Sequence, residues 1–198
     1  MKRAAFGIRM HSGWGILVAV SDMIEVIDRR RIVVTNYDGP RGNQPFHHAE
    51  QLGPAGAEKY LSQYRLESER LAREAIAIAV EALKDSGYRI AAASVLLASG
   101  RPLPALQQIL ASHPLIHTAE GELFREVVRS ACESLRIPVM KYRERDLEEI
   151  AKVALGASAQ SVTRRLALAG KTLGPPWTAD HKAAALSAYV ALREKLAS

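Results

Sequence analysis

A strand–turn–strand pattern near the N-terminus most limits what this chain can fold into. The stretch FGIRMHSGWGILVAVSD begins at Phe6. Apolar and polar side chains alternate through its first part, so Arg9 and His11 share one face of a strand. Gly13 in the turn can adopt the positive φ that a hairpin needs. The apolar run 14–20 then predicts a second strand that is covered on both faces.

Hydrophobic periodicity and turn residues predict the remaining elements. Further strands are expected at 24–35, 89–98 and 137–142, and helices at 57–86, 103–111, 118–136, 144–155, 158–170 and from 179 onward. Residues 36–56 contain four glycines and three prolines, which predicts a long loop. The order predicts an α/β fold: a mixed five-stranded sheet with antiparallel strands 1–3 and helices on both faces. We expect one domain over 1–198, with a helical C-terminal part at 144–198.

The composition favours a water-soluble protein with anionic partners. The 198 residues have a formal net charge of +6, which attracts anions. The single cysteine, Cys132, cannot form an intramolecular disulfide, and its helical pattern predicts a buried side chain. The start MKRAAFGIRM lacks the apolar core of a signal peptide, and no apolar run approaches a membrane span. We therefore expect a cytoplasmic protein without a membrane partner.

Two motifs carry a family resemblance. The first strand contains Gly7-Ile8-Arg9-Met10-His11, and the last helix begins with DHKAAAL from Asp180. Together with the order of elements, these motifs resemble the ribonuclease H-like superfamily, and most nearly its RuvC-type Holliday-junction resolvases. There the first strand typically reads Gly-Ile-Asp-Pro-Gly, and the last helix starts with a short acidic segment followed by alanines. The resemblance covers residues 4–142 and 176–195 and implies a three-layer ribonuclease H-like fold.

The departures from the family pattern concern metal binding. Superfamily nucleases hold two divalent metals between carboxylates of the first strand, the fourth-strand region and the last helix. Here Arg9 replaces the first carboxylate, residues 99–101 read Ser-Gly-Arg without an acid, and only Asp180 remains. Magnesium needs hard oxygen ligands, and arginines repel it. We therefore expect no two-metal centre and no cofactor.

The same residues favour an anion site, because arginine binds oxyanions in a bidentate manner. The expected ligand-binding residues are Arg9, His11, Ser12, Ser99, Arg101 and Lys182, with His48 brought over the site by the loop 36–56. The expected ligand is a phosphorylated small molecule or a nucleic acid. Two alternatives remain open: the loop histidines have no role, or Ser12 or Ser99 is a nucleophile beside His11 or His117.

The stretch SHPLIHTAEGELFR at 112–125 is a dense cluster of histidines and acids. One alternative is that His113, His117, Glu120 and Glu122 are ligands of a transition metal. If a helix begins after Thr118, its acids merely favour the positive helix N-terminus. Alternatively, general acid–base catalysis would use His117, Glu120, Glu122 and Asp180. A further alternative is one divalent metal held by Glu120 or Glu122 together with Asp180, with His11 or His117 as an added ligand.

These alternatives lead to three hypotheses for function. The first is a divergent ribonuclease H-like protein that binds a phosphorylated or nucleic-acid ligand, with hydrolysis left open. The second is a non-catalytic binding or scaffold protein, and the third is a small-molecule hydrolase that uses the His/Glu cluster at 113–122. The basic run DRRRI from Asp28 is either a solvated sheet edge or a phosphate-binding strand. The sequence also leaves a homodimer open.

Overall fold

The computed structural model describes residues 1–36, 40–98 and 102–197. Residues 37–39, 99–101 and 198 fall outside this description. Two of the expected ligand-binding residues, Ser99 and Arg101, therefore lie outside the described residues. Within them, no helix is both long enough and apolar enough to cross a membrane.

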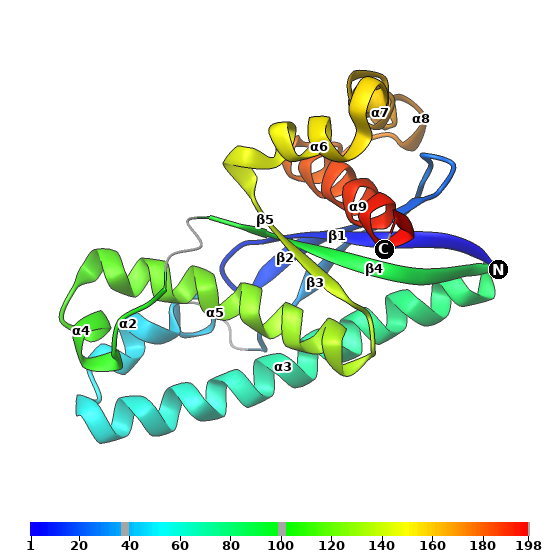
Figure 1. Cartoon of the computed structure of the whole chain (residues 1–198). Helices are drawn as coiled ribbons and strands as arrows, with labels where there is room; N and C mark the ends of the chain where they lie inside the picture. The colour runs from blue at the N-terminus through cyan, green and yellow to red at the C-terminus, as the bar shows by residue number, and fades with distance from the viewer. Residues whose placement is uncertain (37–39, 99–101, 198) are drawn as a thin grey trace.

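A five-stranded mixed sheet forms the centre of the fold (Figure 1). Its strands are β1 (Lys2–Met10), β2 (Trp14–Ser21), β3 (Val26–Val33), β4 (Tyr88–Leu97) and β5 (Val139–Arg143), in the spatial order β3-β2-β1-β4-β5. The first three strands pair antiparallel, and β4 runs parallel to both β1 and β5. This arrangement confirms the sheet predicted from the sequence.

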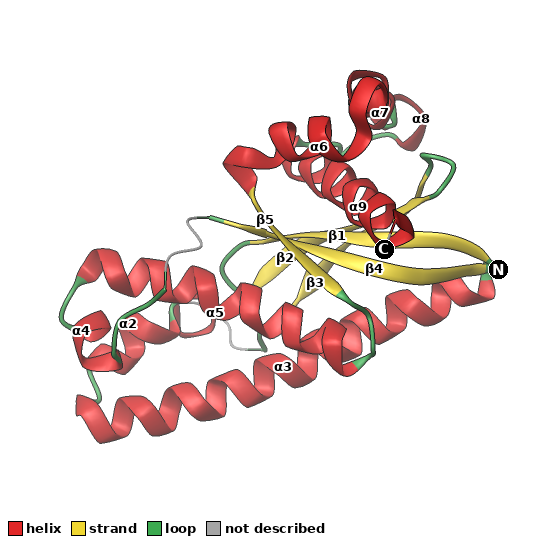
Figure 2. Cartoon of the chain, viewed as in Figure 1, coloured by secondary structure: helices red, strands yellow, loops and turns green. Residues whose placement is uncertain are grey.

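Helices cover both faces of the sheet, so the fold has three layers (Figure 2). They are α1 (Pro40–Asn43), α2 (Pro45–Glu50), α3 (Gly53–Asp85), α4 (Leu106–Leu110), α5 (His113–Ser134), α6 (Leu147–Leu155), α7 (Ala159–Leu168), α8 (Gly170–Leu173) and α9 (Ala179–Ala197). Single 3₁₀ turns at Glu144–Asp146 and Gly156–Ser158 flank α6. Helices α3 and α5 lie on one face, and α6, α7 and α9 lie on the other.

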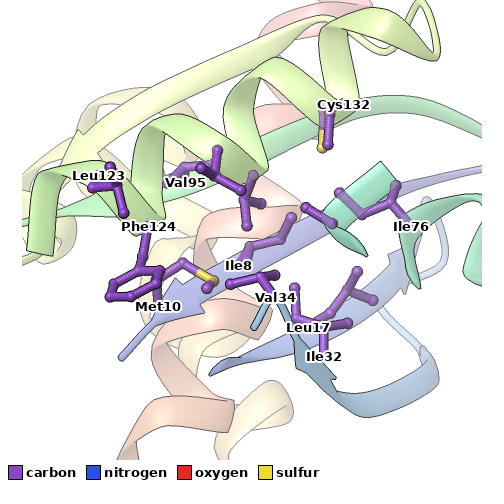
Figure 3. Packing of buried hydrophobic residues seen from close by; sticks show 14 of the residues in the cluster. Ile8, Met10, Leu17, Ile32, Val34, Ile76, Val95, Leu123, Phe124 and Cys132 are labelled. Atoms are coloured by element: carbon purple, nitrogen blue, oxygen red, sulfur yellow. The ribbon is translucent and has the colours of Figure 1, made fainter. Parts of the chain in front are cut away.

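The α3–α5 face contains the larger of the two apolar cores (Figure 3). Ile8 and Leu17 from the sheet pack there with Ile76 of α3 and Phe124 of α5, and all four are fully buried. Cys132 is also buried in this core, and burial raises the pKa of its thiol to about 12. The expectation of a buried cysteine is thereby confirmed.

The α9 face depends on an unusually close approach of helix and strand. A Cβ atom added to Gly7 would lie 1.8 Å from the carbonyl oxygen of Ala184 on α9, so only glycine fits at this position of β1. Residues 184–192 of α9 are all buried, as expected for a helix that lies inside a core. The close packing fixes the first turn of α9, which carries Asp180, beside β1.

Two segments differ from the sequence prediction. The predicted loop is largely helical over its described part 40–56, where α1, α2 and the first turn of α3 form. Proline suits the first turn of a helix, and Pro45 lies in the first turn of α2. Helix α5 begins at His113 rather than after Thr118, with Pro114 in its first turn. Thr118 lies inside the helix and donates a hydrogen bond to the Pro114 carbonyl at 2.9 Å.

Candidate functional site

The end of β1, the end of β5 and the first turn of α9 meet at a group of charged side chains. Arg9 Nη1 lies 2.6 Å from Asp180 Oδ1, and Arg9 Nε lies 3.1 Å from both carboxylate oxygens of Glu144. The side chains of Arg9 and Asp180 are each 25% exposed. One guanidinium therefore bridges carboxylates from two separate elements in a partly shielded setting, where such hydrogen bonds are stronger than in bulk water.

His11 extends this group across the sheet. Its Nε2 lies 2.8 Å from Asp180 Oδ2 and 3.2 Å from Arg9 Nη1. The imidazole stacks on the Trp14 indole, with ring centroids 4.3 Å apart and planes 14° from parallel. The Arg31 guanidinium in turn lies 4.3 Å from the centre of the Trp14 ring, within the range of a cation–π contact. A continuous row of contacts thus runs from α9 through β1 and β2 to β3.

The described residues do not fit the two-metal centre that the fold family implies. A divalent cation between Asp180 and Glu144 would have to take the place of the Arg9 guanidinium, which already hydrogen-bonds to both. The Arg9 guanidinium would also repel a divalent cation bound to the Asp180 carboxylate, because the two positive charges would lie close together. The positive charge of Arg9 is itself compensated, since two carboxylates contact it. An anion could bind Arg9 only in competition with Asp180 and Glu144.

A groove of about 440 Å³ opens beside this group. Its lining residues are Trp14, Ile16, Arg29, Arg30, Arg31, Pro176, Thr178, Asp180 and His181. Arg29 donates hydrogen bonds to the four carbonyls of residues 173–176, and Arg30 forms an ion pair with Asp28 at 2.5 Å. Arg29 therefore holds the segment before α9 in place. Arg31, which is exposed, presents its charge over Trp14 at the groove.

His181 is a buried member of the groove lining. Its Nδ1 lies 2.8 Å from Thr178 Oγ1 and accepts a hydrogen bond from the Thr178 backbone N–H at 3.3 Å. Burial, and next the nearby Arg29 guanidinium, lower the pKa of His181 below its ordinary value, although Asp180 opposes the shift. Neither His181 nor Glu144 was identified from the sequence. The available signal for Glu144 was an acid directly after the last strand, at the end of the sheet where β1 and β4 also end.

The other expected catalytic residues lie on the opposite layer. His117, Glu120 and Glu122 are on α5, across the sheet from Asp180 on α9 (Figure 1). These carboxylates therefore do not join Asp180 in one site. Glu122 forms an ion pair with Arg125 at 3.3 Å. Glu120 is only 3% exposed and accepts a hydrogen bond from His47 Nδ1 at 2.9 Å.

The remaining expected ligand-binding residues have separate positions. Ser12 follows His11 in the turn after β1, and Lys182 lies in the first turn of α9; both are exposed. In the chain, Ser12 lies three positions after Arg9, and Lys182 lies two positions after Asp180. His48 of α2 is turned toward α3, where its ring meets that of Tyr60 edge to face at 4.6 Å. It is not brought over the Arg9 group.

Comparison with solved structures identifies the fold. The chain matches the structure of Thermus thermophilus RuvC in complex with a Holliday junction substrate with a TM-score of 0.53, over 99% of this chain and 96% of that one. This chain has the ribonuclease H-like fold of RuvC. The sequence identity to that RuvC chain is 12%. Another T. thermophilus RuvC structure is 10% identical and covers 100% of this chain and 98% of its own, with a TM-score of 0.49. No protein-family model and no curated protein sequence matches.

Proposed function

We propose that this protein binds nucleic acid with a RuvC-type fold and does not hydrolyse it by two-metal catalysis at the end of β1. The observation that carries the proposal is the Arg9 guanidinium held between Asp180 and Glu144. It places a permanent cation where the family resemblance implies metal ions. The solved RuvC with the same fold is bound to a Holliday junction substrate, which makes branched DNA the first ligand to test.

The surface beside this group supports a nucleic-acid ligand. The chain has a formal net charge of +6, and the groove contains the exposed Arg31 next to an indole. Lys182 and Ser12 are exposed near the same strand end. The cations attract the phosphates of a nucleic acid. The basic run contains no aromatic residue, and the fold places Trp14 of the neighbouring strand against Arg31.

A binding assay tests the first half of the proposal. Fluorescence anisotropy is measured with a labelled four-way junction, a duplex and a single strand over a series of salt concentrations. We expect binding whose affinity falls linearly on a log–log plot against salt, because cations on the protein displace counterions from the phosphates. Failure to bind any of the three at low salt would refute a nucleic-acid ligand.

A matched pair of variants locates the binding surface. Arg31→Ala removes an exposed charge at the groove, whereas Arg73→Ala removes an exposed charge on α3, across the sheet. We expect Arg31→Ala to weaken junction binding several-fold and to flatten the salt slope by about one unit. Arg73→Ala should leave both close to wild type. If the two variants changed junction binding equally, the DNA would bind elsewhere than at the groove.

A cleavage assay tests the second half. Junction and duplex DNA are incubated with the protein and excess Mg²⁺ or Mn²⁺, and products are resolved on denaturing gels. We expect no metal-dependent strand scission that depends on Asp180. Cleavage that Asp180→Asn abolishes would show that the site assembles a catalytic metal centre despite Arg9.

A further inference from the structure

Three histidines gather between α2 and α5, apart from the Arg9 group. They are His47 of α2 and His113 and His117 of α5. One ring nitrogen from each can be chosen so that all three atoms lie within 4.8 Å of one another. The ring centroids are 4.6 to 5.1 Å apart, and the ring planes are inclined by 63 to 83°. The steep inclination shows that the three imidazoles are not stacked on one another.

The spacing of the ring nitrogens matches a metal site. His113 Nε2 and His117 Nε2 are 3.1 Å apart. In a tetrahedral zinc site with Zn–N bonds of about 2.05 Å, neighbouring ligand nitrogens are about 3.3 Å apart. Helix α5 produces this spacing because His113 and His117 are one turn apart on the same face. Two neutral imidazoles that face each other through nitrogen can share only one proton, whereas a metal ion would satisfy both lone pairs.

Glu120 supplies the partner that metal-bound histidines usually have. Its buried carboxylate accepts hydrogen bonds from His47 Nδ1 at 2.9 Å and from the His47 backbone N–H at 3.3 Å. This contact fixes the imidazole and leaves His47 Nε2 free to coordinate an ion. Carboxylates that hold ligand histidines in this way raise ligand basicity and select the tautomer. Glu120 Oε2 also lies 4.0 Å from His117 Nδ1.

The surrounding packing makes the arrangement specific to His47. Phe46 and Ala49 bury the inner side of α2, and His48, the next residue, contacts Tyr60 of α3 instead. Tyr64 of α3 donates a hydrogen bond to the Gly42 carbonyl and so ties the preceding turn to the core. The orientation of α2 therefore determines that His47, and not His48, faces α5.

We propose that His47, His113 and His117 bind one divalent transition-metal ion, with Zn²⁺ as the preferred species. Imidazole nitrogens favour zinc and its neighbours in the first transition row over Mg²⁺ or Ca²⁺. Three protein ligands leave one tetrahedral position free, and His113 and His117 are exposed. That position therefore faces solvent and can hold a water molecule or an anion, as in zinc sites of the open type. The site does not rest on the proposed nucleic-acid function, and its test is separate.

Metal titration of the tag-free, chelator-treated protein tests the site. Isothermal titration calorimetry with Zn²⁺ gives stoichiometry and affinity, and Co²⁺ gives visible absorption bands that report tetrahedral coordination. We expect one equivalent to bind. His113→Ala and His117→Ala should abolish this binding, and Glu120→Gln should weaken it 10- to 100-fold.

Two control variants make the test specific. His48→Ala removes the neighbouring histidine of α2, and His11→Ala removes the histidine beside Asp180; both should bind Zn²⁺ like wild type. Absence of stoichiometric binding, or binding that His113→Ala leaves unchanged, would overturn the proposal. So would loss of binding in His11→Ala. Because Glu120 is buried and its variant could misfold, the exposed His113 and His117 variants, checked by circular dichroism, decide the outcome.

Discussion

The Arg9 guanidinium lies 2.6 Å from the Asp180 carboxylate and thereby joins the end of the first strand to the start of the last helix. The two residues are 171 positions apart in the chain. In the family resemblance these are the positions of two acids that hold metal between them. Here Arg9 stands in the first strand, and its guanidinium pairs with the Asp180 carboxylate without an ion between them.

Arg9→Ala should destabilise the protein, because it leaves Asp180 and Glu144 without their shared cation. Partly exposed ion pairs lie between surface pairs and buried ones, so we expect a loss of about 1–2 kcal/mol in the free energy of unfolding, measured by urea denaturation. Arg70→Ala is the matched control, since Arg70 also bridges two acids, Glu67 and Glu74, but on the exposed surface of α3. Arg70→Ala should lower the free energy of unfolding much less than Arg9→Ala does. Equal losses would show that the Arg9 bridge is no stronger than a surface pair.

Arg9→Asp should create a Mg²⁺ site. The variant would place a third carboxylate beside Asp180 and Glu144, and clusters of carboxylate oxygens are the ligands that Mg²⁺ prefers. Without metal, repulsion among the three acids should lower the melting temperature. Adding millimolar Mg²⁺ should raise it, because an ion that binds only the folded state stabilises it. Wild type should not respond, and an equal Mg²⁺ response in wild type would contradict the displacement of metal by Arg9.

Gly7→Ala should disrupt the packing of β1 against α9. Its Cβ would lie 1.8 Å from the Ala184 carbonyl oxygen, a backbone atom that can move only with the helix. Overpacking typically costs about 1–3 kcal/mol, and contact with backbone places this variant at or above the upper end. Gly56→Ala in α3, where the nearest atom is the Leu52 side-chain Cβ at 3.1 Å, should stay within about 1 kcal/mol of wild type. Thermal unfolding of both variants checks the difference.

Much of the fold could be predicted from the sequence because short links and alternating side chains restrict how strands pair. The turn at Gly13 and the uninterrupted run in β2 led directly to the antiparallel part of the sheet, where the register pairs Met10 with Gly15. Residues 36–56 were harder, because clustered glycines and prolines are typical of loops. In this segment Pro45 lies in the first turn of α2 rather than ending a helix. The buried Phe46 stabilises this six-residue helix, because a helix so short depends on tertiary packing.

The site could be predicted only in part. Arg9, His11 and Asp180 were found together because the family resemblance aligned two distant motifs. Glu144 was missed because it lies 135 residues from Arg9 in the chain, and no local pattern connects the two. The histidine cluster was predicted only in part: His113 and His117 were candidate transition-metal ligands, but with 36–56 treated as a loop nothing distinguished His47 from its neighbour His48. The predicted helix also began after Thr118, whereas α5 begins at His113, so the shared face of His113 and His117 was not predicted.

Acidification should destabilise the protein partly through His181. Burial and the Arg29 guanidinium lower the pKa of His181 in the folded state, whereas in the unfolded chain it returns to its ordinary value near 6.5. Below that value the unfolded state binds the proton more readily, so this contribution to stability is fully present at higher pH. It is lost progressively as the pH falls from about 6.5 toward the folded-state pKa. His181→Asn should therefore have a shallower dependence of unfolding free energy on pH than wild type between about pH 7.5 and 5. Parallel curves for the two proteins in urea titrations would show that His181 does not titrate differently on folding.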